Sequence, residues 1–130
     1  MMDKVVVTAA VIQQKNKYFI AQRKKGKSHE LLWEFPGGKV ELNENPKFCL
    51  ARELKEEFNI VTNVKEFLLE TSHDYGTINI NLKTYNVEIL EGDIELHEHE
   101  KIEWVSLDEM KNYNFIAADY KIIDYLKNIH

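Results

Sequence analysis

The chain has 130 residues, of which 44% are hydrophobic and 30% are charged, and its formal net charge is −5. This composition is typical of a soluble globular protein, and the length suits one domain with its own core, which we place at residues 1–130. The negative charge argues against a nucleic acid polymer as partner, because such binding depends on neutralising many phosphates, and Lys and Arg gather only at residues 23–27.

Residues 5–12 and 18–22 are predicted to be strands joined by a turn at residues 15–17, because β-branched and aromatic side chains fill both runs. A short extended run follows at residues 32–35. It ends at residues 36–38, a Pro-Gly-Gly sequence whose glycines let the backbone turn tightly. We therefore expect strands and a glycine-rich loop in this part of the chain.

Residues 46–58 are predicted to form a helix, since no Gly or Pro interrupts the run after its first residue. Asn45 is a good N-cap, and Pro46 suits the first helical position because the helix needs no backbone donor there. At about 100° per residue one apolar stripe results, which predicts that the helix packs on a core. The stripe consists of Leu50, Ala51, Leu54 and Phe58.

Three acids of this helix, Glu53, Glu56 and Glu57, lie on one arc beside the stripe because they are spaced for neighbouring positions on a helix surface. Glu44 can lean toward the same place, and Arg52 can pair with one of the acids and fix its orientation. Carboxylate and carbonyl oxygens are the ligands that Mg²⁺ prefers, and a bound cation would offset the repulsion between the acids. The alternative is that the glutamates form an ordinary solvated helix face and the glycine pair a simple turn.

Residues 67–73 and 78–89 predict a long hairpin with its turn at residues 74–77. The two runs are therefore expected to be neighbouring antiparallel strands. Apolar side chains alternate in the second strand, but the alternation changes phase between Leu82 and Tyr85, which suggests a bulge.

The last part of the chain predicts a short strand and two helices. The strand lies at residues 102–105, and Ser106 with Glu109 resembles a capping box that opens a short helix. Residues 120–129 are typical of a terminal amphipathic helix. Together with the earlier elements this order predicts an α/β fold in which helices cover the faces of a mixed sheet.

The segment from Phe35 to Ile60, FPGGKVELNENPKFCLARELKEEFNI, resembles the Nudix box, G-x5-E-x7-R-E-U-x-E-E-x-G-U, in which U is aliphatic. Its positions are matched in order by Gly38, Glu44, Arg52, Glu53, Leu54, Glu56, Glu57 and Ile60. One position departs: Asn59 stands where the pattern has its second Gly, and Asn is the residue that next best tolerates the left-handed conformation ending the helix. The flanking WEFPGGKVE is similar to the MutT-type subgroup. The resemblance covers nearly the whole chain and implies an α/β/α sandwich with a mixed central β-sheet.

The resemblance also implies a site for Mg²⁺, with Mn²⁺ as a possible substitute. Its ligands would be the carbonyl of Gly38 and the carboxylates of Glu53, Glu56, Glu57 and Glu98. Glu53 and Glu44 are both candidates for orienting or deprotonating the attacking water, and Arg52 is the cation beside them. His97 and His99 flank Glu98 and could share a transition metal, but no third ligand is evident, so we prefer Glu98 as a ligand of the main site.

Arg23 falls where MutT-type relatives place a cation on the substrate phosphates. Phe35, Tyr75 and Ile80 are candidate walls of a base pocket, with simple core positions as the alternative. Asp119 either reads the edge of the base or only caps the last helix; as an acceptor it favours amino or ring N–H donors, which suits an oxidised guanine or a cytosine. The expected substrate-binding residues are Arg23, Phe35, Gly37, Gly38 and Asp119.

The leading hypothesis is a nucleoside triphosphate pyrophosphohydrolase that converts 8-oxo-dGTP to 8-oxo-dGMP and pyrophosphate, and so serves DNA replication and repair by cleaning the nucleotide pool. Alternatives with the same chemistry are a cytosine nucleotide, a dinucleoside polyphosphate or ADP-ribose. A Nudix-fold sensor that binds a nucleotide without cleaving it is disfavoured, because every expected acid is present. We expect a monomer or weak homodimer in the cytoplasm, since Cys49 is the only cysteine and neither a signal peptide nor a membrane span is evident.

Overall fold

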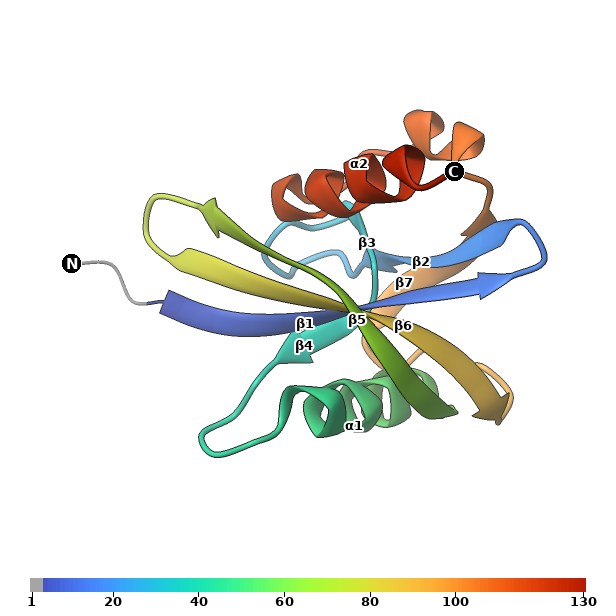
Figure 1. Ribbon diagram of the computed structural model, residues 1–130, viewed down its shortest axis with the longest axis horizontal. Helices are drawn as coiled ribbons and strands as arrows, with labels where there is room; N and C mark the ends of the chain where they lie inside the picture. The colour runs from blue at the N-terminus through green and yellow to red at the C-terminus, as the bar shows by residue number, and fades with distance from the viewer. Residues whose placement is uncertain (1–3) are drawn as a thin grey trace.

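The computed structural model describes residues 4–130. Strands dominate the first and middle parts of the chain, and α1 interrupts them (Figure 1). In chain order the elements are β1 (Lys4–Gln14), β2 (Lys17–Arg23), β3 (Trp33–Glu34), β4 (Gly37–Lys39), α1 (Pro46–Phe58), β5 (Val61–Asp74), β6 (Asn79–Glu91), β7 (His99–Val105), the 3-10 helices η1 (Asp108–Asn112) and η2 (Ala117–Asp119), and α2 (Tyr120–Asn128).

Within the described residues seven strands form a mixed sheet with β1 at its centre. The main strand order is β3-β2-β1-β6-β5, with β4 also paired to β1 and β7 to β2. The pairing of β1 with β6 is parallel, and the other pairings between named strands are antiparallel. The mixed sheet expected from the sequence is therefore confirmed.

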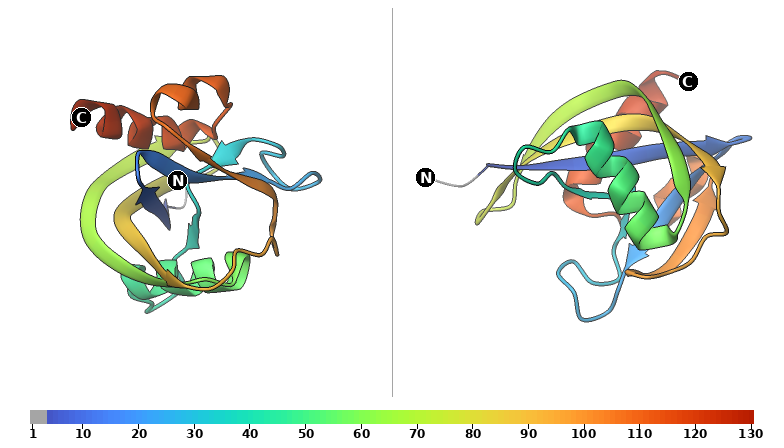
Figure 2. Two further views of the ribbon diagram at one scale, coloured as in Figure 1. Left: turned by 90° about the vertical axis from the view of Figure 1, so that its right-hand side faces the viewer. Right: turned by 90° about the horizontal axis from the view of Figure 1, so that it is seen from below.

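The two α-helices cover opposite sides of the sheet, so the molecule has three layers (Figures 1 and 2). Leu50, Leu54 and Phe58 of α1 are fully buried in one core cluster. Ile122 and Leu126 of α2 belong to a second cluster on the other side. The α/β/α sandwich is confirmed, and each helix is held by its apolar stripe rather than by helix propensity. No helix in residues 4–130 is both long and apolar enough to cross a membrane.

The central strands bury both of their faces, because successive side chains point to opposite sides of a sheet. In β1, Ala9 and Val11 join the cluster beneath α2, whereas Ala10 and Ile12 join the cluster beneath α1. The two sets of apolar residues in β6 divide in the same way: Leu82 faces the α2 side, and Tyr85 and Val87 face the α1 side.

The expected bulge within 78–89 is wrong in its strand, although the pairing is irregular opposite residues 84–87. The change of phase between Leu82 and Tyr85 reflects two buried faces of a regularly alternating strand. In this range the extra residues lie in the partner strand, where the pairing shifts between Val64 and Phe67 and again between Phe67 and Leu69. A further shift, between Val61 and Thr62, lies beyond residue 89. A change of phase indicates a bulge only if the strand buries one face, and here helices cover both faces of the sheet.

Helix α1 has the predicted bounds and both predicted caps. Asn45 Oδ1 accepts hydrogen bonds from Lys47 N at 2.9 Å and Phe48 N at 3.4 Å. At the other end Asn59 takes the left-handed conformation, with φ 58° and ψ 38°, and its N–H donates to Lys55 O at 3.0 Å. The Asn that replaces the pattern's Gly thus ends the helix in the way a Gly would.

The other expected strands and helices are present with shifted ends, but the glycine-rich loop expected at residues 36–38 is wrong, because Gly37–Lys39 form strand β4 and pair with β1. The largest shift is at β5, which begins at Val61 and not at residue 67, because only Val61 and Val64 of its first six residues are apolar and the strand lies at the sheet edge. Ser106 and Glu109 form the predicted reciprocal pair, with Ser106 N donating to Glu109 Oε1 at 2.9 Å and Glu109 N to Ser106 Oγ at 3.1 Å. The helix that they open is the short 3-10 helix η1.

Candidate active site

Two adjoining pockets open beside the glycines of β4. The first, of about 240 Å³, is the carboxylate pocket, lined by Arg23, Lys24, Lys27, Glu34, Gly37, Glu53, Glu56, Glu57, Glu98 and His99. The second, of about 440 Å³, is the apolar pocket, whose walls include Phe35, Tyr75, Ile78, Ile80, Leu82, Ile116 and Asp119. Arg23 and Gly37 line both pockets, so a ligand can lie across the two.

The two glycines of β4 allow close approaches because they lack a Cβ. A Cβ at Gly37 would lie 2.0 Å from the backbone oxygen of Thr8, and a Cβ at Gly38 would lie 2.3 Å from Cδ of Glu53. The backbone of Gly38 therefore runs directly against a carboxylate of α1. Its carbonyl oxygen also accepts a hydrogen bond from Thr8 Oγ1 at 3.1 Å, which fixes the orientation of that peptide.

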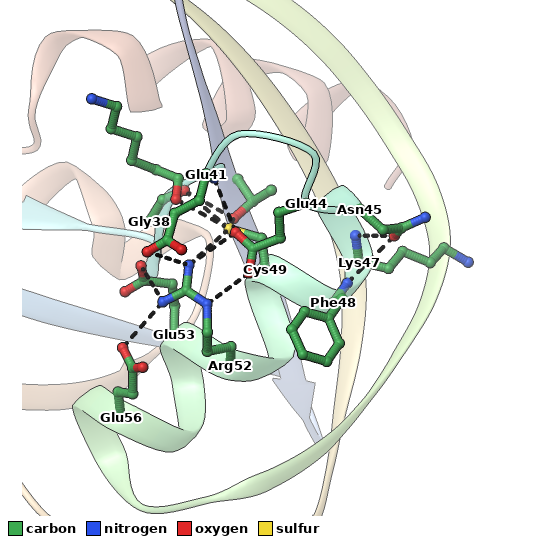
Figure 3. Close-up of polar contacts among 12 residues, drawn as sticks. Gly38, Glu41, Glu44, Asn45, Lys47, Phe48, Cys49, Arg52, Glu53 and Glu56 are labelled. Atoms are coloured by element: carbon green, nitrogen blue, oxygen red, sulfur yellow. Dashed lines mark hydrogen bonds and ion pairs between the residues drawn. The ribbon is translucent and has the colours of Figure 1, made fainter.

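Arg52 holds several acids of the Nudix-like segment together (Figure 3). Its Nε and Nη2 donate to the two oxygens of Glu44 at 2.7 and 3.0 Å. Its Nη1 contacts Glu53 Oε1 and Glu56 Oε2, both at 3.2 Å. The hydrogen bond from Arg52 lowers the pKa of Glu44 to about 2. Both oxygens of Glu44 therefore serve to orient Arg52. Glu44 is not among the described residues that line the carboxylate pocket.

Glu57 is the most buried acid of the carboxylate pocket. Its side chain is buried, and its Oε2 has no hydrogen-bond partner within residues 4–130. Burial, followed by the neighbouring Glu53 carboxylate, raises the pKa of Glu57 far above its usual range. A buried carboxylate without a partner is unfavourable, and a divalent cation with oxygen ligands would satisfy it.

The chemistry of these donors therefore fits Mg²⁺ or Mn²⁺, although no three His, Cys, Asp or Glu side chains of the described residues are already arranged as a complete metal site. Glu53 and Glu56 each use one oxygen on Arg52. Glu98 lines the pocket and pairs with Lys27, whose hydrogen bond lowers the pKa of Glu98.

Four pocket residues were not predicted from the sequence: Lys24, Lys27, Glu34 and His99. Glu34 accepts from Arg23 Nη1 at 3.1 Å and lies 2.7 Å from His99 Nε2, so it connects two segments far apart in the chain. One signal was available, namely a charged residue between Trp33 and Phe35 in an apolar strand. His97 does not share the surroundings of His99, because its ring contacts Glu95 and the carbonyl of Glu56.

Asp119 lies in the wall of the apolar pocket and is only 2% exposed. Its Oδ2 accepts a hydrogen bond from the N–H of Phe35 at 2.7 Å, which ties it to the segment before β4. Burial, followed by the charge of Glu34, raises the pKa of Asp119 well above its usual value. Asp119 stands at the N-cap position of α2, as the capping alternative had it, but its side chain makes no capping hydrogen bond.

The predicted substrate-binding residues are thus brought together across the two pockets. Phe35, Gly38 and Asp119 line the apolar pocket, and Arg23 and Gly37 lie where the pockets meet. Tyr75 also lines the apolar pocket, and its hydroxyl accepts from Ala118 N at 3.0 Å. Acids and cations on one side and apolar walls on the other suit a ligand with a polyphosphate and a planar ring.

Comparison with known proteins gives a consistent result. A family model described as NUDIX domain matches residues 7–125. The chain is 33% identical to the CTP pyrophosphohydrolase of Escherichia coli (strain K12) over 123 residues, which are 95% of this chain and 91% of that protein. It is 32% identical to the 8-oxo-dGTP diphosphatase of Haemophilus influenzae over an aligned region of 130 positions that covers 98% of this chain and 96% of that protein.

Solved structures agree with these relatives. The solution structure of the E. coli ORF135 protein matches with a TM-score of 0.87 and 32% identity, covering 98% of this chain and 91% of that one. The solution structure of the MutT protein, family Nudix hydrolase, from methicillin-resistant Staphylococcus aureus matches with a TM-score of 0.79 and 35% identity over the whole of both chains.

Proposed function

Because the chain belongs to the NUDIX domain family and is a hydrolase of the MutT type, we propose that it is a nucleoside triphosphate pyrophosphohydrolase whose substrate is 8-oxo-dGTP. Water would break the phosphoanhydride and release 8-oxo-dGMP and pyrophosphate. The observation that carries this proposal is the junction of the carboxylate pocket with the apolar pocket at Arg23 and Gly37. A nucleotide laid across that junction has its phosphates among the acids and cations and its base between apolar walls.

The residues for a divalent ion would be the carbonyl of Gly38 and the carboxylates of Glu53, Glu56 and Glu57, with Glu98 as an additional acid. Bound there, Mg²⁺ or Mn²⁺ supplies charge neutralisation for the phosphates and a water of lowered pKa. The unpartnered Oε2 of Glu57 supports this assignment.

Among the two candidates for orienting or deprotonating the water, we propose Glu53. Glu44 binds Arg52 through both of its oxygens, whereas Glu53 lines the pocket and uses only Oε1 on Arg52. Arg52 would hold Glu53 in position without touching the substrate. Arg23 would pair with the phosphates where the two pockets meet, and Lys24 and Lys27 add positive charge to the same pocket.

Asp119 would select the base by accepting a hydrogen bond in its ionised form. A ring N–H donor of the bound base would favour that form and so oppose the effect of burial on the pKa of Asp119. The 8-oxo form of guanine carries a ring N–H at N7, where guanine itself has an acceptor that a carboxylate repels. Phe35 and Tyr75 line the same pocket and would pack against the ring. A buried acceptor of this kind therefore favours the oxidised base over the normal one.

A cytosine nucleotide is the second candidate, since the amino group of cytosine is also a donor to Asp119. The similarity to the E. coli CTP pyrophosphohydrolase over 95% of this chain favours it. ADP-ribose and dinucleoside polyphosphates keep the same chemistry, and a non-catalytic sensor is disfavoured because the acids of the box are present.

The proposal also includes the setting of the enzyme. Residues 1–130 would form a single Nudix hydrolase domain, working as a monomer or weak homodimer in the cytoplasm. Its partner would be the small nucleotide alone, and its role would be to remove damaged nucleotides before DNA replication uses them.

The test is a turnover screen that measures pyrophosphate release with Mg²⁺. It compares 8-oxo-dGTP, dGTP, CTP and dCTP, with ADP-ribose and a dinucleoside polyphosphate as rivals. We expect the highest kcat/KM for 8-oxo-dGTP, with a clear margin over dGTP. A preference for CTP or dCTP would replace the substrate and keep the chemistry, and no hydrolysis of any of these compounds would contradict the proposed activity.

A further inference from the structure

His99 lies behind the carboxylate pocket with only 4% of its side chain exposed. Its ring stacks on Phe58 of α1, with centroids 4.9 Å apart and planes inclined by 18°. Its Nε2 is 2.7 Å from Glu34 Oε2, and its Nδ1 is 3.7 Å from Glu57 Oε1. Within residues 4–130 neither Nδ1 of His99 nor Oε2 of Glu57 has a hydrogen-bond partner.

An irregularity in the sheet brings His99 to this place. Strand β7 pairs with β2 in regular antiparallel register up to Gln22 and Lys101, and then the register shifts so that Arg23 lies opposite His99. Regular pairing would have put residue 100 opposite Arg23. Ile102 faces the α1 side, and the shift lets the odd-numbered His99 reach that same side.

Glu34 connects this histidine to the cation where the two pockets meet. One oxygen of Glu34 accepts from Arg23 Nη1 at 3.1 Å, and the other lies 2.7 Å from His99 Nε2. An ionised carboxylate can only accept, so Nε2 of His99 is the donor in this contact. Two hydrogen bonds therefore link Arg23 through Glu34 to His99, and the 3.7 Å contact of His99 Nδ1 brings Glu57 to the end of this series.

We propose that His99 and Glu34 are positioning residues that hold Glu57 toward the metal and Arg23 toward the phosphates. The inference rests on the proposed function, in which Glu57 ligates the ion. Nδ1 of the imidazole contacts Oε1 of Glu57, and Oε2 of Glu57 remains without a partner and would bind the ion. Glu34 holds the ring through Nε2 and at the same time holds Nη1 of Arg23, whose Nε and Nη2 donate to Ser28. Residues that orient metal ligands in this way typically change metal affinity by about 10- to 100-fold when replaced.

The test measures Mn²⁺ affinity of the full chain without nucleotide, by electron paramagnetic resonance of free Mn²⁺, together with kcat, KM and thermal unfolding. H99Q keeps a donor for Glu34 and removes the ring edge from Glu57. We expect its Kd for Mn²⁺ to rise about tenfold and its kcat to fall, with KM for the nucleotide little changed. E34Q keeps the shape of the side chain and removes its charge. We expect it to weaken Mn²⁺ binding and also to raise KM, because it loosens Arg23.

The matched control is H97Q, a histidine two positions earlier whose ring contacts Glu95 and the Glu56 carbonyl outside the pocket. We expect its Mn²⁺ affinity and kinetics to stay within about twofold of wild type. E34Q tests the inference without changing residue 99, so the test stands even if H99Q does not fold.

Wild-type Mn²⁺ affinity in folded H99Q and E34Q would overturn the inference, as would a lowered Tm with unchanged Kd, which is the result of a purely structural role. Failure of the wild type to bind Mn²⁺ or to hydrolyse a nucleotide would instead overturn the proposed function, and the inference with it. The two failures are distinguished by the wild-type measurement alone.

Discussion

The two pockets of this protein are built in different ways. The carboxylate pocket takes three of its acids, Glu53, Glu56 and Glu57, from one helix. The apolar pocket takes its walls from β1, the segment before β3, the turn between β5 and β6, β6 itself and η2. Chemistry that depends on helix spacing can be predicted from a short segment, whereas base selection depends on contacts between distant segments.

The largest expected effect on turnover comes from a substitution that alters only the carboxylate pocket. E57Q removes the charge that the ion would neutralise, so we expect turnover to fall by about 10³-fold or more. The fold should not suffer, because a neutral amide relieves the burial of an unpartnered carboxylate. Steady-state kinetics and a thermal melt measure both quantities. Near-normal turnover would contradict the assignment of Glu57.

A pair of neighbouring substitutions separates catalysis from folding within β4. In G38A the new methyl group meets the flexible side chain of Glu53, which can move, so we expect a stable protein with turnover reduced by about 10²-fold. In G37A the methyl group meets the backbone oxygen of Thr8, which cannot move without distorting β1, so we expect a loss of stability of about 1 to 3 kcal/mol.

Urea unfolding and pyrophosphate release distinguish the two glycine variants. Equal losses of stability would contradict the expectation that the Glu53 side chain can move away from the new methyl group. Full turnover in G38A would show that catalysis does not need the present arrangement of the residue 38 carbonyl and the Glu53 carboxylate.

The substitution D119N tests the apolar pocket. It should change the selectivity between 8-oxo-dGTP and dGTP more than it changes turnover. The amide offers an NH₂ donor beside its oxygen, so it can accommodate the N7 acceptor of guanine that the carboxylate repels. We expect the kcat/KM ratio of 8-oxo-dGTP to dGTP to change by about tenfold or more, and kcat for the better substrate to change much less. An unchanged ratio would remove Asp119 from base recognition.

The same variant has a smaller effect on stability, and its sign depends on pH. The pKa of Asp119 is raised in the folded chain, mainly by burial, so the folded state binds the proton more tightly than the unfolded state. The wild type therefore loses stability as the pH rises from the unfolded pKa, about 3.9, toward the folded pKa. D119N keeps an acceptor for the Phe35 N–H and removes this loss.

Thermal melts of D119N and wild type check this linkage. We expect the Tm of D119N to exceed that of wild type by about 4 °C at pH 8, which corresponds to about 1 kcal/mol, and the difference to shrink at pH 4. A difference that grows as the pH falls would contradict the raised pKa.

Local patterns predicted the helix of the site in full. The bounds of α1, the cap at Asn45 and the left-handed Asn59 follow from residues close together in the chain. The acids of α1 followed from the same spacing.

Contacts between distant segments could not be predicted in this way. Glu34 and His99 meet only because β2, β3 and β7 are neighbours and the register shifts at Arg23. The same limitation explains the misplaced bulge, since the number of buried faces of β6 depends on which helices cover the sheet.

A crystal structure with Mn²⁺ and a non-hydrolysable 8-oxo-dGTP analogue tests the central claim most directly. We predict anomalous Mn²⁺ density beside Glu53 and Glu57, phosphates at Arg23 and the base against Asp119. Density elsewhere on the surface, or a base lying outside the apolar pocket, would contradict the division of the site into a pocket for the phosphates and a pocket for the base.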